Sequence, residues 1–210
     1  MLLLTALNDM GRVPVGSGAL IQVGLTGALL AELAIDGRLT VAEDGTVQAA
    51  DSRPGNELLA DVYDAVREHL QGRNARHVIG GLSHHIGGSF DRVAGRLIQA
   101  GVLGRDRPSL LRPTRYPVLG TAARQAVVDQ IRAAAAGEGP VSPQVAVVLA
   151  LIGPCRLLER VAPDPATRGE AQRRIDRVTA QTPLAPGVAT IVDELIVAIT
   201  VTATTVPPSF

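Results

Sequence analysis

The sequence predicts a mainly α fold, a single globular multi-helix domain in which a helical core is surrounded by amphipathic helices, with two small β-hairpins. Of the 210 residues, 46% are hydrophobic and 19% are charged, as in an ordinary globular protein with one well-buried core. Aromatic residues make up only 2%, so Leu, Val, Ile and Ala must fill that core, which suits closely packed helices. Apolar residues recur at helical spacing between breaks that contain Gly or Pro, and no linker divides the chain. We therefore expect one domain over residues 1–210.

The first long helix and the first hairpin follow from one continuous stretch. An apolar helix with a single carboxylate covers about Leu20 to Ile35. Asp36-Gly37 ends it, because glycine adopts the positive φ that a helix C-terminus often needs. Arg38 to Val41 then alternates like a strand, and a Glu-Asp-Gly turn leads back into Thr46 to Ala50.

The remaining elements are predicted from caps, breakers and apolar periodicity. In order, these are a helix capped by Asn56 over Glu57–Gln71, a short helix Ala75–Leu82, a loop Ser83–Gly88, a helix Ser89–Ala100 and a second hairpin that begins at Val102-Leu103, returns over Leu110–Tyr116 and stops at Pro117. There follow a helix capped by Thr121 to about Ala136, a helix from Ser142-Pro143 to Ile152, a short turn Arg156–Val161, a helix from Asp164-Pro165 to about Ala180, a Pro-rich loop Thr182–Gly187 and a last helix.

Two apolar segments invite comparison with membrane spans. Leu20 to Ile35 is short for a span and carries Glu32, and Val188 to Val206 contains Asp193-Glu194, a carboxylate pair that is costly in lipid. Both are interpreted as core helices of a soluble domain. The first residues lack the basic region of a cleavable signal peptide.

The charge balance limits the partners. The formal net charge is zero, so no general attraction to nucleic acid or to an anionic membrane is expected, and any anion site must be a local cluster. All 20 basic residues are Arg, which fits either a biased codon usage or a selection for bidentate phosphate contacts. The single cysteine, Cys155, excludes an intramolecular disulfide and fits a reducing cytosol.

Arginines gather around the second predicted hairpin and on the helix before it. The candidate anion- or headgroup-binding residues are Arg92, Arg96, Arg105, Arg107, Arg112 and Arg115. Guanidinium groups that lie on one face of paired strands can hold phosphates, and the alternative is a solvated hairpin whose charges protect its edge. Leu110 and Leu111 are candidates for membrane contact, although a leucine pair in a return strand is more often part of a core.

Other chemistry-bearing residues favour structural roles. His77, His84 and His85 are interpreted as loop or core histidines rather than metal ligands, because no Cys or carboxylate pair lies at ligand spacing. Glu32 is expected to pair with an arginine or to lie at the helix edge, with a buried base as the alternative. Cys155 is interpreted as a small buried hydrophobe. We expect no metal and no cofactor.

The segment from Gly24 to Arg38 resembles the opening block of the Golgi phosphoprotein 3 family, which reads GL-x-G-x-L-x-x-EL-x-x-x-GR. Further matches follow in the same order: the helix Asp61–Leu70, the helix end Leu97–Leu103, the basic hairpin Arg105–Arg115 and the exit Tyr116-Pro117. The resemblance runs from Leu2 to about Val201. Known members bind phosphatidylinositol 4-phosphate at the membrane surface and hold Golgi glycosyltransferases by their cytosolic tails.

The resemblance implies a peripheral membrane adaptor in the cytoplasm, reversibly associated with a membrane, that docks on an anionic phospholipid or phosphoinositide-like headgroup and has a protein client. It also implies self-association through the hairpin as a possible homo-oligomer contact. In the family, a basic residue of the opening block, basic residues on the helix before the hairpin and a nearby Trp form the site, and an apolar hairpin tip enters the bilayer. Here Thr26 takes that basic position and no Trp is present, which fits a bacterial relative.

Two other functions stay open. A short helix, a turn, the helix Ser89–Ala100 and a hairpin also form the layout of a winged helix-turn-helix that binds DNA. Against it, the net charge is neutral and the polar residues on that helix are few, so nucleic acid is not the expected partner. An enzyme or accessory protein of a bacterial biosynthetic pathway is the other alternative, although no nucleophile–base pair is apparent and a catalytic role is not the first expectation.

Overall fold

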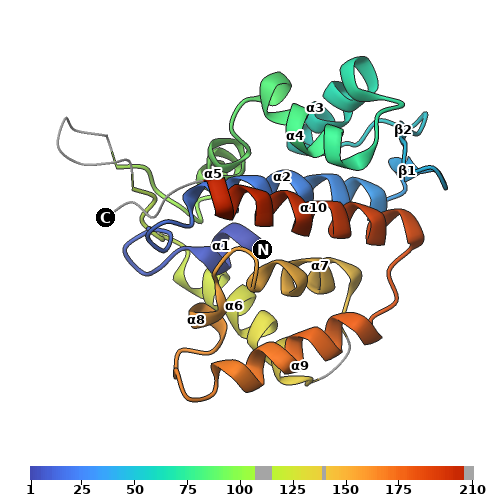
Figure 1. The fold of residues 1–210 in the computed structure, drawn as a ribbon. Helices are drawn as coiled ribbons and strands as arrows, with labels where there is room; N and C mark the ends of the chain where they lie inside the picture. The colour runs from blue at the N-terminus through green and yellow to red at the C-terminus, as the bar shows by residue number, and fades with distance from the viewer. Residues whose placement is uncertain (107–114, 139–140, 206–210) are drawn as a thin grey trace.

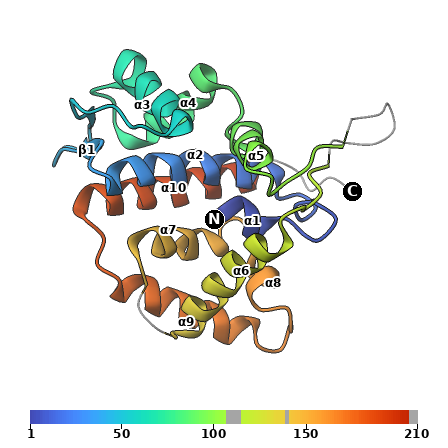
Figure 2. The ribbon, with the colours of Figure 1, turned by 180° about the vertical axis from the view of Figure 1, so that it is seen from behind.

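In the computed structural model, two long helices form the centre of the protein. The structure describes residues 1–106, 115–138 and 141–205. Helix α2 (Gly18–Ile35) and helix α10 (Pro186–Thr205) lie side by side across the middle of the molecule in both views (Figures 1 and 2). A Cβ at Gly27 would lie 2.7 Å from Leu195 Cγ, so the missing side chain lets α10 approach α2 closely. Both helices are long and apolar enough to cross a membrane by length and composition alone. In α2, however, 56% of the residues are buried inside the protein.

One group of elements lies on one side of the central pair (Figure 1). It consists of strands β1 (Leu39–Val41) and β2 (Val47–Ala49), helix α3 (Glu57–Ala65), the π-helix η1 (Val66–Leu70), helix α4 (Ala75–Ile86) and helix α5 (Ser89–Gln99). The strands pair antiparallel with Thr40 opposite Gln48, which confirms the first hairpin.

The other group lies on the opposite side of the central pair (Figure 2). It consists of α1 (Leu2–Ala6), α6 (Thr121–Ala136), α7 (Pro143–Ile152), α8 (Leu158–Val161) and α9 (Arg168–Gln181). Buried Leu, Ile, Val and Ala residues from both groups and from the central helices form one continuous core. The predicted mainly α fold is confirmed.

Several helix ends follow the predicted chemistry. The Arg38 N–H bonds to the Leu33 carbonyl at 2.8 Å and Gly37 has φ +67°, which is the paired arrangement that terminates a helix on glycine. The Asn56 side chain accepts the Leu58 N–H at 3.0 Å at the start of α3, and the Ser142 hydroxyl accepts the Val145 N–H at the start of α7.

Other predicted boundaries are wrong. Helix α4 does not end at Leu82 but continues to Ile86, because Ile86 is buried and holds a further turn against the core. Helix α6 is preceded by Gly120, without a side-chain cap from Thr121. Asp164 caps a turn through the Ala166 N–H, and α9 begins only at Arg168.

The second hairpin is described only at its base. Isolated bridges join Leu103 to Val118 and Asp106 to Arg115, so the pairing passes Pro117 instead of stopping there. Proline still accepts a hydrogen bond through its carbonyl, and the Gly104 N–H bonds to the Pro117 oxygen at 2.7 Å. Most of the predicted return strand lies within 107–114, outside the described residues.

Candidate functional site

The start of α5 is joined to α2 by neutral polar groups. The Thr26 and Ser89 hydroxyls lie 2.8 Å apart, and both residues are buried. The Gln22 side chain accepts the Phe90 N–H at 2.8 Å and so serves one of the free N–H groups at the helix start. Thr26, which the resemblance places at a basic position of the opening block, therefore forms a buried, uncharged contact between two helices.

Arg92 and Arg96 on α5 turn toward α3. Arg92 forms an ion pair with Asp61, and Arg96 Nη1 lies 3.8 Å from Glu57 Oε2. Each guanidinium already has a carboxylate beside it, which lowers the positive potential that α5 offers to an external anion. Arg92 and Arg96 are also the basic side chains with which a winged helix would contact DNA, so the same ion pairs disfavour that function.

Arg105 and Arg115 lie at the base of the second hairpin. The Asp106 N–H bonds to the Arg115 carbonyl at 3.0 Å, which fixes the two strands opposite each other. Arg105 is exposed, and Nε of Arg115 is buried without a hydrogen-bond partner among the described residues. Arg107, Arg112, Leu110 and Leu111 lie outside the described residues.

Tyr116 ties the hairpin base to α5. Its hydroxyl donates a hydrogen bond to Asp91 Oδ1 at 2.7 Å, and its ring packs against Phe90 with centroids 5.4 Å apart. Burial, reinforced by the hydrogen bond to Asp91, raises the pKa of Tyr116 to about 12. The hydroxyl therefore stays protonated and keeps donating at physiological pH.

The loop before α2 brings another arginine to this region. The Tyr116 N–H bonds to the Gly11 carbonyl at 3.3 Å, and Gly11 lies directly against the Tyr116–Pro117 backbone. The next residue, Arg12, is exposed. The sequence analysis did not identify Arg12, because only the fold brings this loop to the hairpin base. The one local indication that this loop contacts another segment was Gly11, a glycine in a polar turn.

The histidines are neither in a loop nor in the core. His77, His84 and His85 are exposed residues of α4. The His85 ring stacks on that of His69, with centroids 4.5 Å apart. Among the described residues, no group of three or more His, Cys, Asp or Glu side chains is arranged to hold a metal ion.

Cys155 behaves as predicted, as a small buried residue. Its thiol lies 3.6 Å from the Leu20 carbonyl and is fully buried, and Gly24 provides the space beside it. Burial raises the pKa of Cys155 to about 12, so the thiol is held in its unreactive, protonated form.

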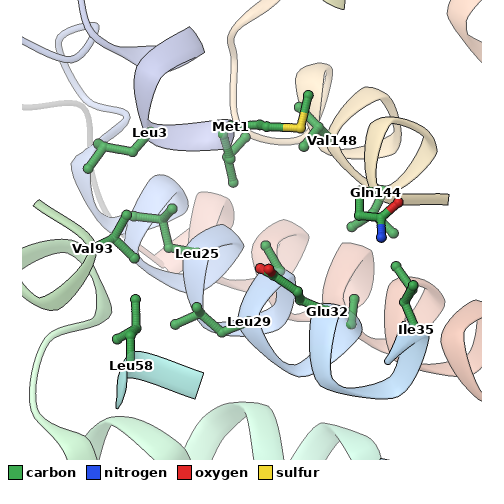
Figure 3. Close-up of a pocket in the computed structure, with 14 residues that line it drawn as sticks. Met1, Leu3, Leu25, Leu29, Glu32, Ile35, Leu58, Val93, Gln144 and Val148 are labelled. Carbon is green, nitrogen blue, oxygen red and sulfur yellow. The ribbon is translucent and has the colours of Figure 1, made fainter. Parts of the chain in front are cut away.

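A mostly apolar cavity opens between α1, α2, α3, α5 and α7, and no single segment of the sequence predicted it. It has a volume of about 220 Å³. Figure 3 shows Leu3, Leu25 and Val93 at one side of the cavity, Gln144 at the other, and the Glu32 carboxylate between them. The structure shows no ion pair between Glu32 and an arginine of the described residues, and Glu32 is an exposed residue of α2, as the helix-edge prediction has it. Partial burial raises the pKa of Glu32, and the Met1 amino group opposes that shift.

The comparisons with known proteins agree with the fold. The family model of Golgi phosphoprotein 3 (GPP34) matches residues 1–195. A search of curated proteins found no match to this chain. Because the family model covers more than nine tenths of the sequence, the chain belongs to the Golgi phosphoprotein 3 family.

Proposed function

We propose that this protein is a peripheral membrane adaptor that docks on anionic lipid headgroups and recruits a protein client to the membrane. Its docking surface includes Arg12, Arg105 and Arg115 at the base of the second hairpin, and the predicted Arg107, Arg112, Leu110 and Leu111 belong to the same proposal. Membership of the Golgi phosphoprotein 3 family supports the proposal. The cytoplasmic, reversible membrane association expected from the sequence belongs to the same proposal.

The observation that carries the proposal is the contact of Gly11 with the Tyr116–Pro117 backbone. This contact brings the exposed Arg12 to the same end of the molecule as the exposed Arg105. The chain has no net charge, so a local group of arginines is what draws it to an anionic surface. Near an anionic leaflet, each arginine contributes about 1 kcal/mol.

Arg92 and Arg96 take a smaller share in this proposal. Asp61 and Glu57 already lie beside their guanidinium groups and weaken the attraction of these arginines for a phosphate. Since Thr26 is neutral and buried, we propose recognition by headgroup charge. Phosphatidylinositol 4-phosphate, the ligand of known family members, is the first phosphoinositide to compare with a simple anionic lipid.

Vesicle flotation tests the proposal. The protein is floated with vesicles of phosphatidylcholine alone, and with the same lipid plus phosphatidylglycerol or phosphatidylinositol 4-phosphate. We expect binding to both anionic mixtures and loss of binding at high salt, because salt screens exposed charges. The double variant Arg12→Ala and Arg105→Ala should bind about 30-fold more weakly, since two arginines contribute about 2 kcal/mol.

A matched variant controls for net charge. Arg173 and Arg177 are exposed on α9, which lies away from α5 in both views (Figures 1 and 2). Replacing both with Ala removes the same charge, and we expect binding to stay near that of the wild type. Equal binding to neutral vesicles, no binding to any vesicle, or an equal loss in the α9 variant would each overturn the proposal.

A further inference from the structure

Exposed aliphatic side chains gather where the loop between α1 and α2 meets the base of the second hairpin. Among the described residues, the three most exposed large hydrophobic side chains are Val15, Leu119 and Met10, at 88%, 64% and 61%. Met10 and Val15 belong to the loop, and Leu119 lies at the exit of the hairpin. Both segments lie at the same end of the molecule in both views (Figures 1 and 2). Single exposed hydrophobic residues are ordinary, but a group of them indicates an interaction surface.

Direct contacts join the two segments that carry these side chains. Gly11, the residue after Met10, lies against the Tyr116–Pro117 backbone. The Leu119 side chain lies beside Gly104, since a Cβ on that glycine would be 3.4 Å from Leu119 Cδ1. Met10 and Leu119 are therefore held on the two sides of one contact between loop and hairpin.

The turn that carries Met10 is closed by its own hydrogen bonds. The Asn8 side-chain oxygen accepts the Met10 N–H at 3.0 Å and the Arg12 N–H at 2.9 Å, and the Asn8 N–H donates to the Arg12 carbonyl at 2.8 Å. The Asp9 carboxylate pairs with Arg124 Nη1 at 2.8 Å, which ties the turn to α6. The backbone is thus fixed in a form that leaves the Met10 side chain exposed.

Exposed arginines lie beside the aliphatic side chains. Arg12 is two residues from Met10. Arg105 is next to the glycine against which Leu119 lies, and the exposed Asp106 balances only part of this positive charge. A guanidinium beside an aliphatic side chain matches the boundary of an anionic leaflet, where phosphates lie above the first acyl carbons. A partner protein would need a hollow for each projecting side chain, whereas acyl chains rearrange around it.

We propose that Met10, Val15 and Leu119 enter the acyl-chain boundary of the leaflet when the arginines bind anionic headgroups. This inference rests on the proposed function and adds a lipid contact outside the hairpin tip. Because Met10 and Leu119 are fixed to one contact, they enter together and orient the protein. This end faces the membrane, and β1, at the opposite end in both views, faces away from it (Figures 1 and 2).

Single tryptophans test the insertion, because the chain has no Trp of its own. Met10→Trp and Leu119→Trp are mixed with the phosphatidylcholine–phosphatidylglycerol vesicles of the flotation assay, with and without lipid brominated on its acyl chains. We expect the emission of both variants to shift to shorter wavelength and to be quenched by the brominated lipid. Thr40→Trp, at an exposed position of β1, is the control and should show neither change.

The outcomes separate this inference from the proposed function. If the proteins float with the vesicles but the Met10 and Leu119 variants emit like the Thr40 control, the insertion is refuted and the proposed function stands. If no protein floats, both are refuted. An emission shift without vesicles that grows with protein concentration would place a second copy of the chain on this surface, which also refutes the insertion.

A neutral double variant measures the apolar contribution. Met10→Gln with Leu119→Gln changes no charge and should weaken vesicle binding about tenfold at each salt concentration, because salt does not screen apolar contacts. Arg12→Ala with Arg105→Ala should instead reduce the salt dependence of binding. Circular dichroism shows whether each variant is folded. Unchanged binding of the folded glutamine variant would refute the insertion.

Discussion

Replacing Gly11 with Ala measures how tightly the loop before α2 is held against the base of the second hairpin. Gly11 has φ +69°, and a Cβ there would lie 2.7 Å from the Pro117 nitrogen and closer still to the Tyr116 carbonyl. These are backbone atoms, so no side-chain rotation relieves the clash. The loop must move away from the hairpin, and the hydrogen bond from the Tyr116 N–H to the Gly11 carbonyl is lost.

The cost has two parts. Holding an alanine in the left-handed region costs about 1–2 kcal/mol. Losing the hydrogen bond costs about 0.5–1.5 kcal/mol more. We therefore expect Gly11→Ala to lower the free energy of unfolding by about 1.5–3.5 kcal/mol, and the Tm by about 2–4 °C for each kcal/mol in a domain of this size.

Gly16 in the same loop provides the control. It has φ +75°, but the nearest atom to a Cβ there is Arg156 Nη1 at 3.9 Å. Gly16→Ala should lower the free energy of unfolding only by the cost of holding an alanine in the left-handed region, about 1–2 kcal/mol. Urea unfolding followed by circular dichroism gives both values. If the two variants lose the same stability, the Gly11 contact with the hairpin is not what holds the loop, and our placement of Arg12 beside the docking region is wrong.

Three further predictions concern single side chains. Cys155 should not react with a thiol reagent in the folded protein at pH 8 and should react fully in urea, because burial raises its pKa to about 12; an equal rate in both conditions would contradict its burial. Burial raises the pKa of Glu32 above its ordinary value of 4.5, so the folded chain holds that proton more tightly and stability falls as the pH rises through the raised pKa. Glu32→Gln should therefore be more stable than the wild type at neutral pH and equal to it below pH 4.5, as urea unfolding at both pH values can check. Asn56→Ala should lower the free energy of unfolding by about 1 kcal/mol, because α3 loses its cap, whereas Asn56→Asp should keep most of it.

Local chemistry explains which parts of the fold could be predicted. The end of α2 at Gly37, the first hairpin and the caps at Asn56 and Ser142 each depend on residues that are close in sequence. Ser83 to Gly88 looked like a loop by the same local rules, since it is polar and rich in Gly. The last turn of α4 forms there because Ile86 reaches the core, a gain that no local pattern contains.

The site was less predictable than the fold, because it depends on contacts between distant segments. Arg92 and Arg96 were identified as cations, but their partners Asp61 and Glu57 lie on another helix that the sequence does not place beside them. The residues that line the cavity beside Glu32 come from α1, α2, α3, α5 and α7, so no local motif could predict the cavity. Thr26 was recognised as a departure from the family pattern, but its hydroxyl contact with Ser89 became visible only when α5 was in place.

The central pair of helices also sets the order in which the protein is completed during synthesis. About 150 residues separate the end of α2 from the start of α10. At about 5–20 residues per second, the ribosome needs about 8–30 s to add them. Throughout that interval the face of α2 that α10 covers in the finished protein is open to chaperones. Translation speed and chaperone supply should therefore affect the yield of this protein more than that of a helical bundle whose neighbouring helices are consecutive.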